Sequence, residues 1–176
     1  MSLPQTDPFF SVIIPTYNRS KAVVKAVESV LEQTFSSFEV IVVDDGSSDD
    51  TSEALNPLLE QDSRIIYVFQ ENQERSAARN NGVVVAKGEF ICFLDSDDVL
   101  QVNHLLELAK TIDSKNKAIA LYHVNGELRS ADKVTQITFP EHVANESKLE
   151  YVLSTAIIST SFVCISKEIL KKHRFN

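Results

Sequence analysis

The chain of 176 residues carries 17 basic and 25 acidic side chains, a formal net charge of −8, and 43% of its residues are hydrophobic. This length and balance are typical of one globular domain and exclude a disordered or multidomain protein. An acidic protein has no long-range attraction for phosphate backbones, so we expect no nucleic-acid partner.

The cysteines and the apolar runs indicate the compartment. Cys92 and Cys164 are too few for a disulfide framework or a four-ligand zinc site, and their apolar neighbours predict reduced thiols in the core. The longest uncharged run, 151–166, is shorter than the roughly 18 apolar residues of a spanning helix. We therefore expect a cytoplasmic protein, with peripheral membrane contact left open for a longer form. Residues 1–8 are interpreted as a leader or an expression remnant, and residues 9–176 as one domain.

The first hundred residues alternate between short β-branched runs, typical of buried strands, and segments with apolar residues at helical spacing. In chain order, the pattern predicts a strand over 9–14, a helix over 22–31, a strand over 38–43, a helix over 51–61, a strand over 65–69, a helix over 77–87 and a strand over 89–94. This alternation predicts a parallel sheet.

Polar residues at the helix starts suggest caps. Ser20 is placed to cap the first helix, and Asp50 with Glu53 forms a capping-box arrangement at the second. Pro57 lies inside the second helix, where we expect it to bend or split the helix.

The last third has a weaker pattern. It predicts a helix over 103–113, strands over 119–124, 134–139 and 160–165, and a helix over 146–154. The fold class expected for the chain is α/β, with a mostly parallel sheet, helices on both faces and a Rossmann-like nucleotide-binding core. Ligands of such a fold bind at the carboxyl ends of the strands.

Two predicted strands end in acidic residues. Asp44 and Asp45 follow the second strand, and Asp95, Ser96 and Asp97 follow the fourth. The four glycines do not allow a G-x-G-x-x-G or P-loop motif, which excludes dehydrogenases and P-loop NTPases that use them. A divalent cation bridging phosphate and carboxylate oxygens would then hold a diphosphate, which favours Mg²⁺ or Mn²⁺. The alternative is that these acids only cap turns and helix starts.

Five sequence blocks occur in a characteristic order and spacing. They are FSVIIPTYNR at 10–19, SVLEQTF at 29–35, FEVIVVDDGSSD at 38–49, ARNNG at 78–82 and GEFICFLDSDD at 88–98. In this order, the blocks resemble family 2 glycosyltransferases of the GT-A fold. The resemblance covers about residues 10–108, and the remaining part of the chain is similar to the family only loosely.

The resemblance implies a site and roles for its residues. The nucleotide-sugar site would comprise Pro15, Thr16, Tyr17, Asp45, Arg79, Asp95 and Ser96, and the metal site Asp97 with Asp95. Tyr17 would pack against the base of the donor, Asp45 would accept the N3–H of uracil, and Arg79 would neutralise a carboxylate or the diphosphate. Asp44 would support the turn. Arg75 departs from the family pattern, in which this position is often small or glycine, and would either assist Arg79 or block part of the groove.

The resemblance also implies the reaction. A sugar would move with inversion from a nucleotide-diphosphate sugar, with UDP as the favoured nucleotide, to a hydroxyl of a saccharide or lipid-linked acceptor. Such reactions occur in cell-wall or polysaccharide biosynthesis. Mg²⁺ or Mn²⁺ would stabilise the leaving diphosphate, and a general base would take the acceptor proton. No acid after Leu108 lies in the family's Glu-Asp motif, so the base is expected beyond Asn176 and the chain to be a truncated donor-binding part. The donor sugar, the acceptor and the oligomeric state stay open.

Two alternatives remain at this point. One is a non-catalytic nucleotide-sugar-binding domain. The other is a haloacid-dehalogenase-like phosphatase, because residues 94–100 fit its D-x-D-x-[TV] motif. That class places the motif on the first strand and needs a later acidic pair, and neither condition holds here. Four histidines show no ligand spacing and are expected at the surface, namely His104, His123, His142 and His173.

Overall fold

The computed structural model describes residues 7–114, 121–123, 126–130, 133–137 and 163–175. Strands and helices alternate through the first four strands, as the sequence predicts. The elements in chain order are β1 (Phe10–Thr16), α1 (Ser20–Leu31), β2 (Phe38–Asp44), α2 (Thr51–Gln61), β3 (Ile65–Phe69), α3 (Glu74–Val85), β4 (Phe90–Phe93), α4 (His104–Ser114), β5 (Leu121–His123), β6 (Gly126–Ser130), β7 (Lys133–Ile137), β8 (Val163–Ser166) and α6 (Lys167–Lys172).

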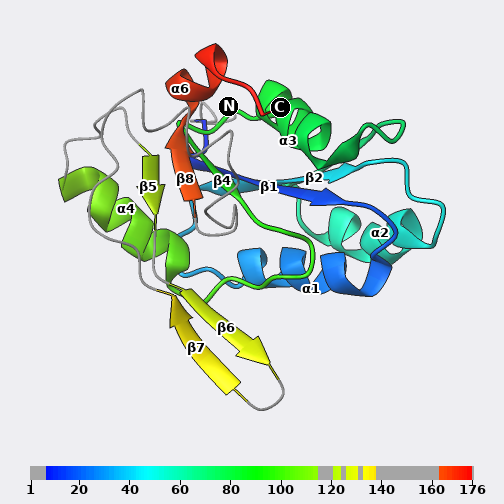
Figure 1. Cartoon of the computed structure of the whole chain (residues 1–176), viewed down its shortest axis with the longest axis horizontal. Helices are drawn as coiled ribbons and strands as arrows, with labels where there is room; N and C mark the ends of the chain where they lie inside the picture. Colours follow the sequence, from blue (N-terminus) through cyan, green and yellow to red (C-terminus); the bar gives the residue numbers. More distant parts are fainter. Residues whose placement is uncertain (1–6, 115–120, 124–125, 131–132, 138–162, 176) are drawn as a thin grey trace, which may run out of the picture.

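The main sheet has six strands in the order β3-β2-β1-β4-β8-β5. β1 lies parallel to both β2 and β4, and β2 lies parallel to β3. β8 is antiparallel to its two neighbours, β4 and β5. The predicted α/β class with a mostly parallel sheet is confirmed (Figure 1). β6 and β7 form a separate antiparallel pair, of which β6 was not predicted.

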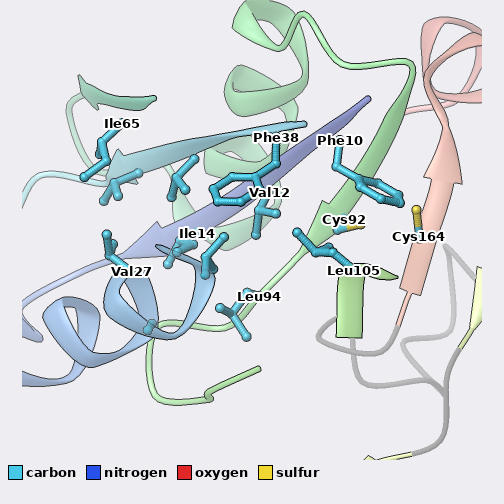
Figure 2. Close-up of a cluster of buried hydrophobic side chains, with 14 of the residues drawn as sticks. Phe10, Val12, Ile14, Val27, Phe38, Ile65, Cys92, Leu94, Leu105 and Cys164 are labelled. Carbon is cyan, nitrogen blue, oxygen red and sulfur yellow. The ribbon is translucent and has the colours of Figure 1, made fainter. Parts of the chain in front are cut away.

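Helices cover both faces of this sheet, because side chains of a strand alternate between its faces. Phe10, Val12 and Ile14 of β1 belong to one core cluster, together with side chains of α1, α2 and α4. Ile13 belongs to the other cluster, which α3 and α6 complete. Figure 2 shows the first cluster, in which Leu105 of α4 lies near Phe10. Because both faces of the central strands are buried, their sequences are continuous apolar runs.

The two cysteines lie opposite each other in this core. Cys92 of β4 pairs with Cys164 of the antiparallel strand β8, and both are free and buried (Figure 2). Burial raises the pKa of the Cys164 thiol well above its ordinary value. Both cysteines are therefore core thiols, as the sequence predicts, and the Cys164 thiol stays protonated in this environment.

The predicted helix caps are wrong. Neither Ser20 nor Asp50 caps a helix with its side chain: α1 already begins at Ser20, and Asp50 makes no capping bond. The side chain of Asp49 instead accepts hydrogen bonds from the first backbone N–H group of both helices. Its Oδ2 accepts a hydrogen bond from the Ser20 backbone N–H at 3.3 Å, and its Oδ1 accepts one from the Thr51 N–H at 3.1 Å. Asp49 therefore ties the starts of α1 and α2 together.

Other boundaries and predictions differ in detail. α2 continues through Pro57 rather than splitting there, because a proline costs one intrahelical bond while Leu55 and Leu58 keep the helix packed on the core. α3 begins at Glu74, three residues before the predicted start. The predicted helix over 146–154 lies outside the described residues. Among the described residues, no helix is both long and apolar enough to span a bilayer.

The histidine expectation is wrong for His104. Its side chain is half-buried at the start of α4, between the exposed loop and the buried Leu105. Burial lowers the pKa of His104 to about 4, since a charged imidazole would lose its hydration there. His173 is also half-buried, and His142 lies outside the described residues.

Candidate functional site

A cleft with a volume of about 480 Å³ opens at the carboxyl ends of β1, β2 and β4. This is the edge at which parallel sheets bind ligands, and the volume suits a small-molecule site. Seven predicted site residues line it: Pro15, Thr16, Tyr17, Asp45, Asp95, Ser96 and Asp97. The sheet therefore brings together residues that are up to about eighty positions apart in sequence because parallel strands end at one edge.

The end of β1 supplies two contrasting side chains. Thr16 is 3% exposed, and its Oγ1 has no hydrogen-bond partner among the described residues. Tyr17 is 48% exposed and lines the same cleft. A half-exposed aromatic ring offers a flat apolar face, while a buried hydroxyl without a partner favours a polar ligand atom nearby.

Asp44 and Asp45 have different surroundings although they are adjacent. Asp44 accepts hydrogen bonds from the Ser47 N–H at 2.8 Å and the Tyr67 hydroxyl at 2.6 Å. Burial, with the Asp44 carboxylate close by, raises the pKa of Tyr67 to about 12, so the phenol remains a donor. Asp44 thus holds the turn after β2, in which Gly46 adopts a φ of 81°. The left-handed region favours glycine.

Asp45 is 4% exposed and lies between β2 and the start of α3. Its Oδ1 accepts hydrogen bonds from Gln70 Nε2 at 2.6 Å and from the Gln73 backbone N–H at 2.8 Å. Gln73 is the residue before the first turn of α3, where unpaired N–H groups favour a carboxylate. The carboxylate is therefore held firmly at the wall of the cleft.

Arg79 is placed behind the cleft wall. Its side chain is buried on α3, and Nη2 donates to Asp95 Oδ1 at 2.7 Å. The guanidinium carbon also lies 5.8 Å from the centre of the Phe175 ring. Arg79 does not line the cleft, so among the predicted contacts its geometry favours the carboxylate rather than direct contact with a diphosphate.

Asp97 faces solvent and is held by a residue that the sequence analysis did not select. Arg19 Nη1 forms an ion pair with Asp97 Oδ2, and the two side chains are 48% and 57% exposed. This pair joins the loop after β1 to the loop after β4, across the mouth of the cleft. Exposed pairs of this kind contribute little to stability, about 0–1 kcal/mol, and open readily.

The acidic side chains fit Mg²⁺ or Mn²⁺ as part of a shared site. Asp95 and Asp97 offer the hard oxygen ligands that these ions prefer. Within the described residues, no group of three His, Cys, Asp or Glu side chains converges to hold a metal alone. A cation here would need further oxygen ligands, which fits ions that bind one or two carboxylates together with substrate phosphates.

Sequence reasoning missed several residues of the cleft. These residues are Arg19, Asn72 and Glu74. Arg75 is exposed and also lines the cleft, and this position is compatible with both predicted roles, assistance to Arg79 and obstruction of part of the groove. Asn18 locks the neighbouring loops, because its Oδ1 accepts the Ser48 N–H at 2.7 Å. The signal for Arg19 and Asn18 was their place directly after the first strand, where a parallel sheet gathers site residues.

A family comparison covers nearly the whole chain. Residues 11–174 match the sequence pattern described as glycosyl transferase family 2. The chain belongs to this family. The glycosyltransferase GlyG of Streptococcus pneumoniae serotype 4 is 31% identical over 173 residues, which cover 94% of this chain and 58% of GlyG. Membership, together with the place of Asp95 after the fourth strand, leaves the phosphatase alternative without support.

Solved structures share the fold of this chain. The structure of S. aureus TarS 1-349 in complex with UDP has a TM-score of 0.74 and 29% identity, and the match covers 93% of this chain and 48% of the TarS 1-349 chain. The complex of the same protein with UDP-GlcNAc has the same TM-score and identity. The GT-A fold expected from the resemblance is confirmed. The chain spans about half the length of these relatives.

Proposed function

We propose that this glycosyltransferase moves a sugar with inversion from a UDP-sugar donor to an acceptor hydroxyl, with Mg²⁺ or Mn²⁺ bound at the donor. The observation that carries the proposal is the meeting of Tyr17, Asp45 and Asp97, from three different strand ends, at one cleft. TarS 1-349, which is 29% identical to this chain, has been solved with UDP and with UDP-GlcNAc, and these complexes support uridine as the nucleoside of the donor.

The base of the donor would lie against the β1 and β2 ends. Tyr17 would stack on the uracil ring, a contact worth about 1–3 kcal/mol by comparison with other base-stacking sites. Asp45 would accept the N3–H of uracil, and the buried Thr16 hydroxyl would gain the partner that the described residues do not provide. Pro15 and Ser96 would complete the walls beside the ribose and diphosphate.

The diphosphate would lie toward the β4 end. Asp97 would hold the cation, with Asp95 beside it and oriented by Arg79. A divalent cation at this position supplies charge stabilisation to the leaving diphosphate. Arg75 would add positive charge at the mouth of the cleft. Inversion requires attack from the side opposite the diphosphate by a hydroxyl whose proton a general base accepts, and we assign that role to none of the described residues.

The binding part of the proposal is tested by calorimetry with UDP and Mn²⁺. Asp45→Ala removes the proposed base contact, and we expect at least about a tenfold loss of UDP affinity, since an unmade hydrogen bond to a charged group costs about 1.5–3 kcal/mol. Asp113→Ala, at an exposed position of α4, is the matched control and should bind like the wild type. Absence of UDP binding by the wild-type chain would contradict the proposal.

The catalytic part needs a separate measurement. Release of UDP from UDP-GlcNAc, followed with and without Mn²⁺, reports donor cleavage even when the acceptor is unknown. Metal-dependent release that Asp97→Ala abolishes is the expected result. Tight UDP binding without release would favour a non-catalytic nucleotide-sugar-binding domain.

A further inference from the structure

A chain of side-chain amides lies behind Asp45. Asn81 Nδ2 donates to Gln70 Oε1 at 2.5 Å, and Gln70 Nε2 donates to Asp45 Oδ1 at 2.6 Å. Gln70 itself is buried, and its backbone N–H is fixed by the Asp44 carbonyl oxygen at 2.9 Å. The relay therefore connects α3, the residue after β3 and the end of β2.

Chemistry fixes the direction of this relay. An ionised carboxylate only accepts hydrogen bonds, so Gln70 must turn its NH₂ group toward Asp45. That leaves the Gln70 carbonyl oxygen to face α3, where it needs a donor, and the amide of Asn81 provides one. Each member of the relay consequently has one orientation that satisfies its neighbours.

The relay leaves Asp45 with one usable oxygen. Oδ1 accepts two hydrogen bonds, from Gln70 Nε2 and from the Gln73 N–H, which use both of its lone pairs. No hydrogen bond from the described residues reaches Oδ2 of Asp45. Because both donors to Oδ1 belong to the protein wall, the carboxylate is also prevented from rotating.

Nucleobases differ in how many donors they present to such a group. Uracil presents a single N–H between two carbonyl oxygens. Guanine presents two adjacent donors, N1–H and N2–H, which suit a carboxylate with both oxygens available. At Asp45 the second guanine donor would meet an oxygen whose lone pairs are already used, and a buried donor without a partner is costly.

We propose that Gln70 and Asn81 are positioning residues that determine base specificity, because they fix Asp45 as a single hydrogen-bond acceptor and so select uracil over guanine. This inference rests on the proposed function, in which Asp45 contacts the donor base. Of the two residues, Gln70 contacts Asp45 and Asn81 contacts Gln70, and the proposed function assigns neither a contact with the donor.

The test compares UDP and GDP affinities by calorimetry in the presence of Mn²⁺. We expect the wild-type chain to prefer UDP by at least about tenfold, the range that an unpaired polar group produces. Gln70→Leu removes one of the two hydrogen bonds to Asp45 Oδ1 and leaves a lone pair of that oxygen available, so it should bring the UDP-to-GDP affinity ratio to within about threefold of unity. Gln33→Leu is the matched control. Gln33 is equally buried, and its side-chain amide donates hydrogen bonds to the Ser29 and Gln101 carbonyl oxygens, away from the cleft.

A second variant covers the case in which Gln70→Leu does not fold. Asn81→Ala changes an exposed position of α3 and keeps Gln70, so it should lower the ratio in the same direction by a smaller factor. An unchanged ratio in the folded relay variants, or an equal change in Gln33→Leu, would overturn the inference alone. Failure of the wild type to bind either nucleotide would overturn the proposed function and the inference together.

Discussion

Glu74 holds a backbone conformation that its side chain disfavours. It is the first residue of α3, is exposed, and has a φ of 71°. This left-handed conformation costs a residue with a Cβ atom about 1–2 kcal/mol, whereas glycine adopts it freely. The chain accepts this cost where α3 starts beside the cleft, next to the Gln73 N–H that binds Asp45.

The strain at Glu74 gives a stability prediction. Glu74→Gly and Glu74→Ala both remove the charge, but only the first removes the Cβ atom. We expect the glycine variant to have the higher free energy of unfolding, by about 1 kcal/mol, in urea denaturation. Equal stabilities of the two variants would show that the conformation stores no strain.

His104 makes stability depend on pH. The pKa of His104 is lowered from 6.5 to about 4 by burial, so between these values the unfolded chain binds a proton that the folded chain does not. The free energy of unfolding contributed by this group is present above pH 6.5 and is lost as the pH falls toward 4, by at most about 1.4 kcal/mol per pH unit.

This pH effect can be measured by removing the titrating group. In urea denaturation between pH 7 and pH 4.5, we expect His104→Gln to lose stability less steeply than the wild-type chain does. Above pH 7 the difference between the two proteins should be independent of pH. Parallel slopes throughout the range would contradict the assigned burial effect.

At the scale of elements, α3 is the helix that shapes the site. The Gln73 N–H, directly before its first residue, donates a hydrogen bond to Asp45. Further along the helix, Arg79 donates to Asp95 and Asn81 donates to Gln70. This requires close contact with β1. A Cβ atom built on Gly82 would lie 2.5 Å from Ile13 Cγ2, so glycine is needed for the helix to approach the strand.

Gly82→Ala should therefore destabilise the chain even though alanine favours helices. We expect the free energy of unfolding to fall by about 1–3 kcal/mol, the usual cost of overpacking, and UDP affinity to fall with it because α3 shifts. Val84→Ala, at an exposed position of the same helix, is the control and should leave both quantities nearly unchanged. A stabilised Gly82→Ala variant would mean that α3 moves freely on β1.

At the scale of the whole molecule, contacts between loops that lie far apart in sequence cross the mouth of the cleft. The pair of Arg19 and Asp97 joins the loops after β1 and β4, and Asn18 joins the first of these to the loop after β2. A cation at Asp97 would have to compete with the Arg19 guanidinium for the same carboxylate oxygens.

Removing this competitor should strengthen cation binding. We expect Arg19→Ala to bind Mn²⁺ more tightly in the presence of UDP, by up to about fivefold at low salt, because an exposed ion pair is worth about 1 kcal/mol at most. Titration of Mn²⁺ followed by electron paramagnetic resonance measures this. Arg64→Ala, whose arginine pairs with Asp62 before β3, is the control. Weaker Mn²⁺ binding in Arg19→Ala would show that Arg19 helps to hold the donor instead.

The sequence by itself determined the strand and helix order and the acids after β2 and β4, because apolar periodicity and strand-end position are local properties. It also determined the family, through five blocks spread over residues 10–98. It did not determine the caps or the residues that orient the site. Asp49 caps α1 from 29 positions away, and Glu39 of β2 accepts the Lys87 N–H at 2.6 Å inside an apolar strand.

Tertiary structure decided which atoms of the acids remain available. Asp44 is used by Ser47 and Tyr67, and one oxygen of Asp45 is used by Gln70 and Gln73. Hydrogen-bond partners of this kind depend on packing between elements, and no local pattern in the chain encodes them. The sequence therefore supplied the functional groups, whereas the folded sheet and α3 decided which lone pairs face the cleft.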